Sequence, residues 1–267
     1  MNPQNHNSSS DLKAKITERI QELAQATDAA RVSEEMLRYL DMCSRFHQYS
    51  PCNVWLILMT QPSASHVAGF KKWQSMGRYV RKGEHGIPIL APIISTIIND
   101  IGKEEQRLVG FKVVYVFDVS QTEGDQLLDP PNWKSPEKNS ELNERLIHFA
   151  KSKGIQVQNK SIGKDIQGVS LGGKIIVDPE AGTKTLIHEI VHELLHHVEG
   201  LLINSTIREL EAESVAYVVA KHFGLNGLSS PNYNALHGAT AELIIDCLER
   251  IRNSAMEIIQ ALEIPST

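Results

Sequence analysis

The segment His188-Glu189-Ile190-Val191-His192 holds the residues that are best suited to chemistry. Side chains four apart share one face of a helix, so His188 and His192 can direct two imidazoles at a single metal ion. Glu189 lies beside them, where a carboxylate can take a proton from a water at the metal. The pattern therefore predicts a zinc site on a helix, with His188 and His192 as ligands and Glu189 as the catalytic base.

Two histidines and a water leave a tetrahedral zinc ion one protein ligand short. The segment Arg208 to Glu213 contains three carboxylates. Glu209 and Glu213 share a helix face, whereas Glu211 points roughly the opposite way. We predict Glu209 as the third ligand and Glu213 as the carboxylate that accepts a hydrogen bond from a ligand histidine. The reverse assignment of these two glutamates stays open.

Other polar residues near the motif are weaker candidates. His196 and His197 follow the second ligand on drifting helix faces, so we expect both to be exposed polar residues. His222, His237 and Tyr217 could stabilise an oxyanion, but a packing or surface role is the simpler expectation for each.

A bound zinc ion lowers the pKa of its water toward ~7 and polarises a scissile carbonyl. Glu189 would then pass the proton of that water to the leaving amine. Two other interpretations remain: an amphipathic helix with solvated side chains, or a zinc site that only stabilises the fold. Glu189 argues against the structural site, because such a site needs no base.

The overall composition excludes several classes of protein. The chain has 267 residues, 41% of them hydrophobic and 22% charged, with a net charge of −5, so any nucleic-acid contact must use a local basic patch. Cys43, Cys52 and Cys247 lack CxxC spacing and indicate a reducing compartment. Residues 1–10 carry no signal-peptide pattern, and no apolar run reaches the ~20 residues of a membrane helix. We therefore expect a cytoplasmic protein with no membrane contact.

The periodicity of apolar residues predicts an α+β protein. A long helix capped by Asp11 is expected to continue past Leu40. Further helices are expected at 51–61, 70–76, 140–153, 183–197, 206–223 and 235–262, and strands at 87–90, 93–98, 111–117, 155–157 and 174–177.

A polar, proline-containing stretch between residues 120 and 142 marks the expected domain boundary. We therefore predict a disordered lead-in at 1–10, an N-terminal α+β module at 11–128, a linker at 129–139 and a C-terminal zincin-like domain at 140–267.

The second half of the sequence resembles the ImmA/IrrE-like family of gluzincin-type metallopeptidases. That family joins an HExxH helix to a downstream Glu-x-x-Ala-(Asn/Asp/Glu) helix, which here corresponds to 188–192 and 209–213, followed by Ser214-Val215-Ala216-Tyr217. The resemblance implies a zinc metallopeptidase with the ligands and base named above. Glu193 departs from the pattern, since extended HExxH motifs favour an uncharged residue after the second histidine.

The first half is similar to the N-terminal domain of ArdC-type antirestriction proteins, a module that binds single-stranded DNA. The matching stretches are 49–53, 67–73, 77–87 and 116–122. The order of a DNA-binding module followed by a zincin is that of ArdC-type proteins as a whole. The resemblance implies non-specific binding of single-stranded DNA.

Residue types support a nucleic-acid surface only locally. Between His66 and Pro92 there are five basic residues and one acidic residue, and aromatic side chains alternate with them. Stacking together with phosphate pairing is how single strands are held without sequence readout. The DNA-binding residues that we predict are Asn53, Phe70, Lys71, Lys72, Trp73, Arg78, Arg81 and Lys82. The alternative is that the aromatic residues belong to the core and the lysines to a solvated face.

Three functions are compatible with these features. The first is a zinc-dependent metallopeptidase-like protein that binds single-stranded DNA and serves in antirestriction or DNA protection. The second is a regulatory protease that cleaves a repressor, as ImmA-like proteins do. The third is a non-catalytic DNA-binding protein stabilised by zinc. The sequence does not identify a protein or peptide substrate.

Overall fold

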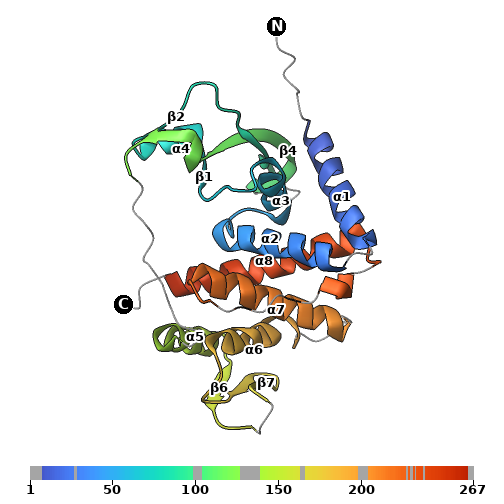
Figure 1. Ribbon diagram of the computed structural model, residues 1–267, viewed down its shortest axis with the longest axis vertical. Coiled ribbons are helices and arrows are strands. Elements are labelled where there is room, and N and C mark those ends of the chain that lie inside the picture. The colour runs from blue at the N-terminus through green and yellow to red at the C-terminus, as the bar shows by residue number, and fades with distance from the viewer. Residues whose placement is uncertain are drawn as a thin grey trace. The chain divides into compact units, whose positions relative to one another are not determined.

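The computed structural model describes residues 8–26, 29–98, 104–126, 139–162, 166–197, 204–226, 228, 231, 233–236 and 238–263. The chain divides into two compact units (Figure 1). The first comprises Met1–Gln21 and Cys52–Leu128, and the second comprises Glu22–Pro51 and Asp129–Thr267. Both units contain helices and strands, so the predicted α+β class is confirmed.

The first unit is built on an antiparallel three-stranded sheet in the order β1-β4-β3. A second pair of strands, β2 and β5, is also antiparallel. The elements after its first helix are α3 (Pro51–Thr60), β1 (Val67–Gly69), α4 (Phe70–Ser75), β2 (Arg78–Val80), β3 (Ile87–Ile98), β4 (Glu104–Asp118), the 3-10 helix η1 (Val119–Gln121) and β5 (Thr122–Gly124). Helix α3 begins at Pro51, as predicted, because proline suits the first turn of a helix.

The N-terminal region differs from the single long helix that we predicted. It forms α1 (Ser9–Gln25) and, after a break, α2 (Ala29–Arg45). Ser8 caps α1, because its hydroxyl accepts from the backbone N–H of Asp11 while the Asp11 carboxylate accepts from the backbone N–H of Ser8. Asp11 is therefore the partner of the cap and not the cap itself. The helix also begins inside the predicted lead-in at 1–10, of which residues 1–7 lie outside the described ones.

Polar side chains join the elements of the first unit. Asn53 on α3 is buried, and its amide donates to the Leu90 carbonyl and accepts from the Leu90 N–H, at 2.9 and 2.8 Å. Trp73 on α4 is also buried and donates its indole N–H to the Phe117 carbonyl. Both side chains thus attach a helix to the main sheet.

The second unit combines a small mixed sheet with a cluster of helices. Strand order is β6-β8-β7, with β6 parallel and β7 antiparallel to β8. The elements after α2 are α5 (Ser140–Ser152), β6 (Gln156–Asn159), β7 (Gly168–Ser170), β8 (Lys174–Val177), α6 (Thr183–Leu195), α7 (Ser205–His222), the 3-10 helix η2 (Tyr233–Leu236) and α8 (Ala241–Glu263). Strand β7 was not predicted, because three residues containing a glycine give no alternation pattern.

Helix α7 lies at the centre of this unit. It packs against α6, α8 and α2, and ten of its residues are buried. A helix enclosed on several sides has no distinct apolar stripe, and polar residues on it must find partners inside the protein. The contact of α2 with α7 also explains why residues 22–51 belong to this unit, although we predicted one N-terminal module at 11–128.

Within the part of the chain that the structure describes, no helix is both long and apolar enough to span a bilayer.

We expect Asn53→Ala to destabilise the first unit by about 2 kcal/mol or more, because it leaves the buried N–H and carbonyl of Leu90 without their partner. Chemical denaturation of the purified protein measures this change. Gln74→Ala, at an exposed position of α4, serves as the control. Equal stability of the two variants would contradict the packing role of Asn53.

Candidate metal centre

Two histidines of α6 face one another one turn apart. The Nε2 atoms of His188 and His192 are 2.9 Å apart, and both side chains are mostly buried. The predicted helix positions them, since α6 continues without a break from Thr183 to Leu195.

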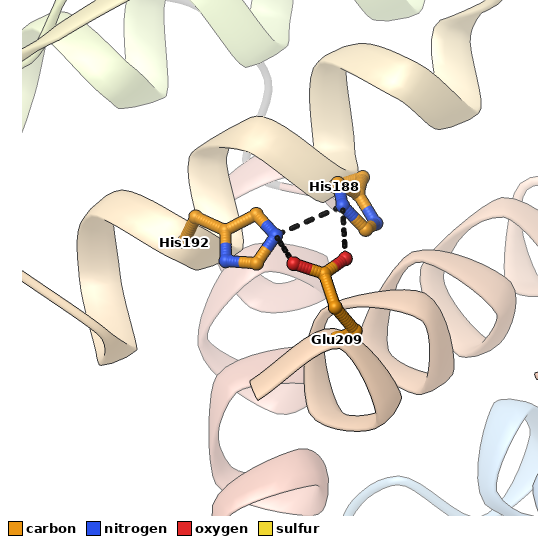
Figure 2. A group of neighbouring side chains, drawn as sticks. All are labelled: His188, His192 and Glu209. Atoms are coloured by element: carbon orange, nitrogen blue, oxygen red, sulfur yellow. Dashed lines mark hydrogen bonds and ion pairs between the residues drawn. The ribbon is translucent and has the colours of Figure 1, made fainter. Parts of the chain in front are cut away.

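Glu209, near the start of α7, completes the group (Figure 2). One of its carboxylate oxygens is 3.5 Å from Nε2 of His188, and the other is 3.5 Å from Nε2 of His192. Among the described residues this is the group that could hold a metal ion, with one ligand atom from each residue and all of them within 4.8 Å of one another. The Glu209 side chain is 63% exposed, so the group opens to solvent on that side.

The separations fit a small divalent cation. Bonds of about 2.0–2.2 Å to nitrogen and oxygen at tetrahedral angles place ligand atoms roughly 3.3–3.5 Å from one another. The distances from the two histidine nitrogens to Glu209, each to a different carboxylate oxygen, lie in this range, and the distance between the histidine nitrogens is slightly shorter. Two imidazoles and one carboxylate are also the donor set of catalytic zinc sites that keep one position open.

Glu213 has a different environment. One of its oxygens is 3.3 Å from Nδ1 of His188, on the ring edge opposite Nε2, and the other accepts from the Lys184 ammonium. The His188 contact, opposed by burial and assisted by Lys184, lowers the pKa of Glu213 to about 2. Burial lowers the pKa of His188, but Glu213 and the other nearby carboxylates raise it to a net value above 6.5. Glu213 thus lies where a carboxylate orients a ligand histidine, and Glu209 lies where it could be the ligand.

Glu189 is held close to strand β7. The residue is only 8% exposed, and burial raises the pKa of its carboxyl above 4.5. A Cβ atom on Gly168 would lie 2.8 Å from Cγ and Oε1 of Glu189, so only glycine lets the strand approach this closely. Gly168 is a site residue that the sequence did not indicate, because the strand around it was not predicted.

Glu193 points away from the group and attaches the β7–β8 hairpin to α6. Its carboxylate accepts from the Ser170 hydroxyl and from the backbone N–H groups of Leu171, Gly172 and Gly173. Burial raises its pKa, but these hydrogen bonds outweigh burial and keep the pKa below 4.5. A charged residue after the second histidine is therefore compatible with the site, because the Glu193 carboxylate points away from the ligand group and binds the β7–β8 hairpin.

The two histidines that follow differ from each other. His196 was predicted to be exposed, and this was wrong: its side chain is buried between His192 and the fully buried Glu211. His197 is partly exposed, as expected, and shares a hydrogen bond with Ser170.

The oxyanion candidates already have structural partners. The Tyr217 hydroxyl donates to Asp41, and burial together with this carboxylate raises its pKa. The ring nitrogens of His222 lie 2.8 Å from the Ser44 carbonyl and 3.0 Å from Glu263. These contacts favour the packing role that we expected for both, and His237 lies outside the described residues.

Comparison with known families identifies the first half of the chain. A family model described as the N-terminal domain of anti-restriction factor ArdC matches residues 9–157, more than half of the sequence. The protein belongs to this ArdC family. The resemblance predicted for the first half is thereby confirmed, whereas the resemblance of the second half to metallopeptidases stays a prediction.

Individual relatives of this ArdC-family chain are distant. An uncharacterized protein of Bacillus anthracis, pXO2-81, is 25% identical over 241 residues, which cover 72% of this chain and 41% of that protein. The Mn(II)-bound crystal structure of the antirestriction ArdC protein from plasmid R388 is similar in fold, with a TM-score of 0.50 and 18% identity over 85% of this chain and 99% of that one. The metal-free structure of the same protein covers 80% of this chain and 83% of its own, at a TM-score of 0.47 and 18% identity.

Four of the predicted DNA-binding residues of the ArdC-family domain have structural partners. Asn53 and Trp73 are buried against the sheet, as described above, which differs from our expectation that they contact DNA. Arg78 donates to the hydroxyl and carbonyl of Thr122, and Arg81 pairs with Glu84 and donates to the Ser120 carbonyl. These arginines support the β2–β5 region, and their charge is partly satisfied there.

The other four predicted residues are exposed. Phe70 is 49% exposed at the start of α4, Lys71 and Lys72 follow it, and Lys82 lies in the turn after β2. Within the described part of the chain, none of the three lysines forms an ion pair. Tyr79, 56% exposed on β2, is an aromatic residue of this region that we did not predict.

We expect Glu193→Gln to destabilise the second unit by about 2 kcal/mol, since the amide NH2 group would oppose one of the hairpin N–H donors. Because the folded-state pKa of Glu193 is lowered, its stabilisation is full above pH 4.5 and is lost as the pH falls through the lowered value. Denaturation of variant and wild type at pH 7 and at decreasing pH measures both effects. Glu180→Gln, at an exposed position, should change neither; a stable Glu193→Gln protein would contradict the role of Glu193 in holding the hairpin.

Proposed function

We propose that this ArdC-family protein is a metal-dependent hydrolase of the peptidase type that also holds single-stranded DNA. The observation that carries the hydrolase is the convergence of His188, His192 and Glu209, with their ligand atoms within 4.8 Å. The buried carboxyl of Glu189, on the same helix as both histidines, adds the base that a purely structural metal site does not need.

The side chains have separate roles in this proposal. His188, His192 and Glu209 would hold the ion, and Glu213 would orient His188 through Nδ1. When bound, a divalent cation supplies Lewis-acid polarisation of a carbonyl group. Glu189 takes the proton of an attacking water and passes it to the leaving amine, and its raised pKa makes it a stronger base than an exposed glutamate. Gly168 allows the Glu189 carboxylate to occupy this position, because a larger residue would clash with it.

The identity of the ion is part of the proposal. Imidazole ligands suit zinc, and carboxylates suit manganese, so a site with both can take either. Two histidine ligands favour zinc, while the crystal structure of the R388 ArdC protein contains Mn(II). We propose zinc as the natural ion and manganese as an alternative occupant.

The DNA-binding part of the proposal depends on exposed groups of the first unit. Phe70 and Tyr79 can stack on bases, and Lys71, Lys72 and Lys82 can pair with phosphates. Membership of the ArdC family supports a role in antirestriction, in which a protein of this kind would protect single-stranded DNA. The wild-type chain is acidic overall, so binding should depend on this local patch.

For the metal site, we expect purified protein to carry one divalent ion per chain, and His188→Ala and Glu209→Ala to lose it. Glu189→Gln should keep the ion and hydrolyse an unstructured test polypeptide at least ~100-fold more slowly than wild type, because it lacks the base. Elemental analysis and a cleavage assay measure the two properties. His197→Ala is the control, since His197 contacts Ser170 and no proposed ligand.

The outcomes separate the alternatives. Protein without metal would exclude the hydrolase. The non-catalytic zinc-stabilised protein would be favoured by two results together: the wild type binds metal but cleaves nothing, and removal of the ion unfolds the second unit. Cleavage of one repressor only would favour the regulatory protease.

For DNA, we expect replacement of Lys71, Lys72 and Lys82 by alanine to weaken binding of a single-stranded oligonucleotide. The slope of log K against log salt should fall by about 2, at ~0.7 per phosphate contact. Replacement of Lys151, Lys160 and Lys174 removes the same charge from the second unit and is the matched control. Salt titration of oligonucleotide binding by both triple variants tests the proposal. The proposal requires a smaller slope for the variant of the first unit than for the control.

A further inference from the structure

A line of polar contacts leads from His192 away from the proposed metal position. Nδ1 of His192 is 2.9 Å from Nδ1 of His196, one turn further along α6. Nε2 of His196 is 3.1 Å from Oε2 of Glu211 on α7. The other oxygen of Glu211 accepts from Nε and Nη2 of Arg250 on α8, at 2.8 and 2.6 Å. The line thus connects three helices of the second unit.

Glu211 remains a carboxylate at the centre of this line. Its side chain is fully buried. The guanidinium of Arg250, which always carries its charge, lies 2.8 and 2.6 Å from one oxygen of this group and holds it as a carboxylate. An ionised carboxylate has no proton to give, so it only accepts hydrogen bonds.

When both imidazoles are neutral, an accepting Glu211 fixes which nitrogen of each ring carries the proton. Because Glu211 only accepts, the proton of a neutral His196 must lie on Nε2, and its Nδ1 is then an acceptor. Nδ1 of His192 must therefore carry the proton that this acceptor receives. A neutral imidazole has one N–H, so Nε2 of His192 is left with a free lone pair.

The free lone pair points at the proposed metal position. Nε2 is the atom of His192 that lies 2.9 Å from His188 and 3.5 Å from Glu209, and Figure 2 shows the other ring nitrogen on the far side. A lone pair at this position is available to a cation that His188 and Glu209 also bind.

We propose that His196, supported by Glu211 and Arg250, is a positioning residue that holds His192 in its Nδ1–H form with Nε2 directed at the cation. The inference rests on the proposed metal site and extends it. The two ligand histidines are then oriented differently. His188 meets the partly exposed Glu213 directly, whereas His192 reaches a buried carboxylate through a second imidazole. Fixing the tautomer in advance favours metal binding, because the ligand atom needs no rearrangement.

The test compares His196→Phe with wild type. Phenylalanine is similar in size to histidine but has no acceptor for His192 and no donor for Glu211. In metal-free protein labelled with 15N-histidine, long-range 1H–15N spectra should show wild-type His192 as the Nδ1–H form, with the signal assigned from His192→Gln. In His196→Phe the Nε2–H form should appear. The dissociation constant for Zn²⁺, measured by competition with a chelator, should rise by about 10-fold or more.

Two further variants keep the test decisive. His196→Gln retains one acceptor and one donor and should recover most of the Zn²⁺ affinity, which a role in packing alone would not produce. His197→Ala should leave the Zn²⁺ affinity and the His192 spectrum unchanged.

The possible results have different meanings. Wild-type His192 in the Nε2–H form, or a folded His196→Phe protein with wild-type affinity, would overturn the inference. A wild-type protein that shows the Nδ1–H form but binds neither Zn²⁺ nor Mn²⁺ would refute the proposed metal site, while the effect of His196 on His192 would stand. If His196→Phe does not fold, His196→Gln beside wild type decides: an Nε2–H signal for His192 in that variant overturns the inference, and retention of Nδ1–H supports it.

Discussion

The contact between α6 and α7 is the constraint on which the candidate site depends. Each helix alone presents only part of a metal site, two imidazoles on α6 and a carboxylate on α7. The two helices pack against each other, and both carry buried apolar residues, among them Ile187, Ile190 and Val191 of α6 and Leu210 of α7. The distances between the two imidazoles and Glu209 are therefore set by the packing of α6 on α7 and not by the attraction between these side chains.

Five glutamates near the site illustrate how local environment assigns roles to one type of side chain. Glu189 is buried beside Gly168 and keeps a raised pKa, while Glu193 accepts several hydrogen bonds and keeps a lowered one. Glu211 is enclosed with Arg250, Glu213 lies between Lys184 and His188, and Glu209 remains largely exposed. The roles that we propose for Glu189 as base, Glu213 as orienting group and Glu209 as ligand, and the structural contacts of Glu193 and Glu211, thus reflect different surroundings of one side-chain type.

The first unit separates its polar residues in a similar way. Side chains that join helices to the sheet are buried and have partners, as Asn53 and Trp73 do. Lysines and aromatic rings on α4 and β2 remain accessible. A nucleic-acid strand needs accessible charge and ring faces, so only the second group suits that role.

The sequence by itself determined what depends on local backbone geometry. The spacing of His188 and His192 places them on one face of any helix, and the spacing of Glu209 and Glu213 does the same on the next. Helix positions were therefore predicted closely, and the family resemblance of the first half was recognised from its motifs. The break between α1 and α2 was not predicted, because the apolar period continues on both sides of it.

Only the tertiary structure decided which polar residues are buried. His196 and Glu211 are on different helices and come together through packing of α6 on α7, which no local pattern records. Asn53 is 37 residues from its partner Leu90, and Gly168 lies beside Glu189 through a short strand with no alternation. The reason is physical: periodicity reports the direction of a side chain relative to its own element, and burial depends on what other elements bring to that side.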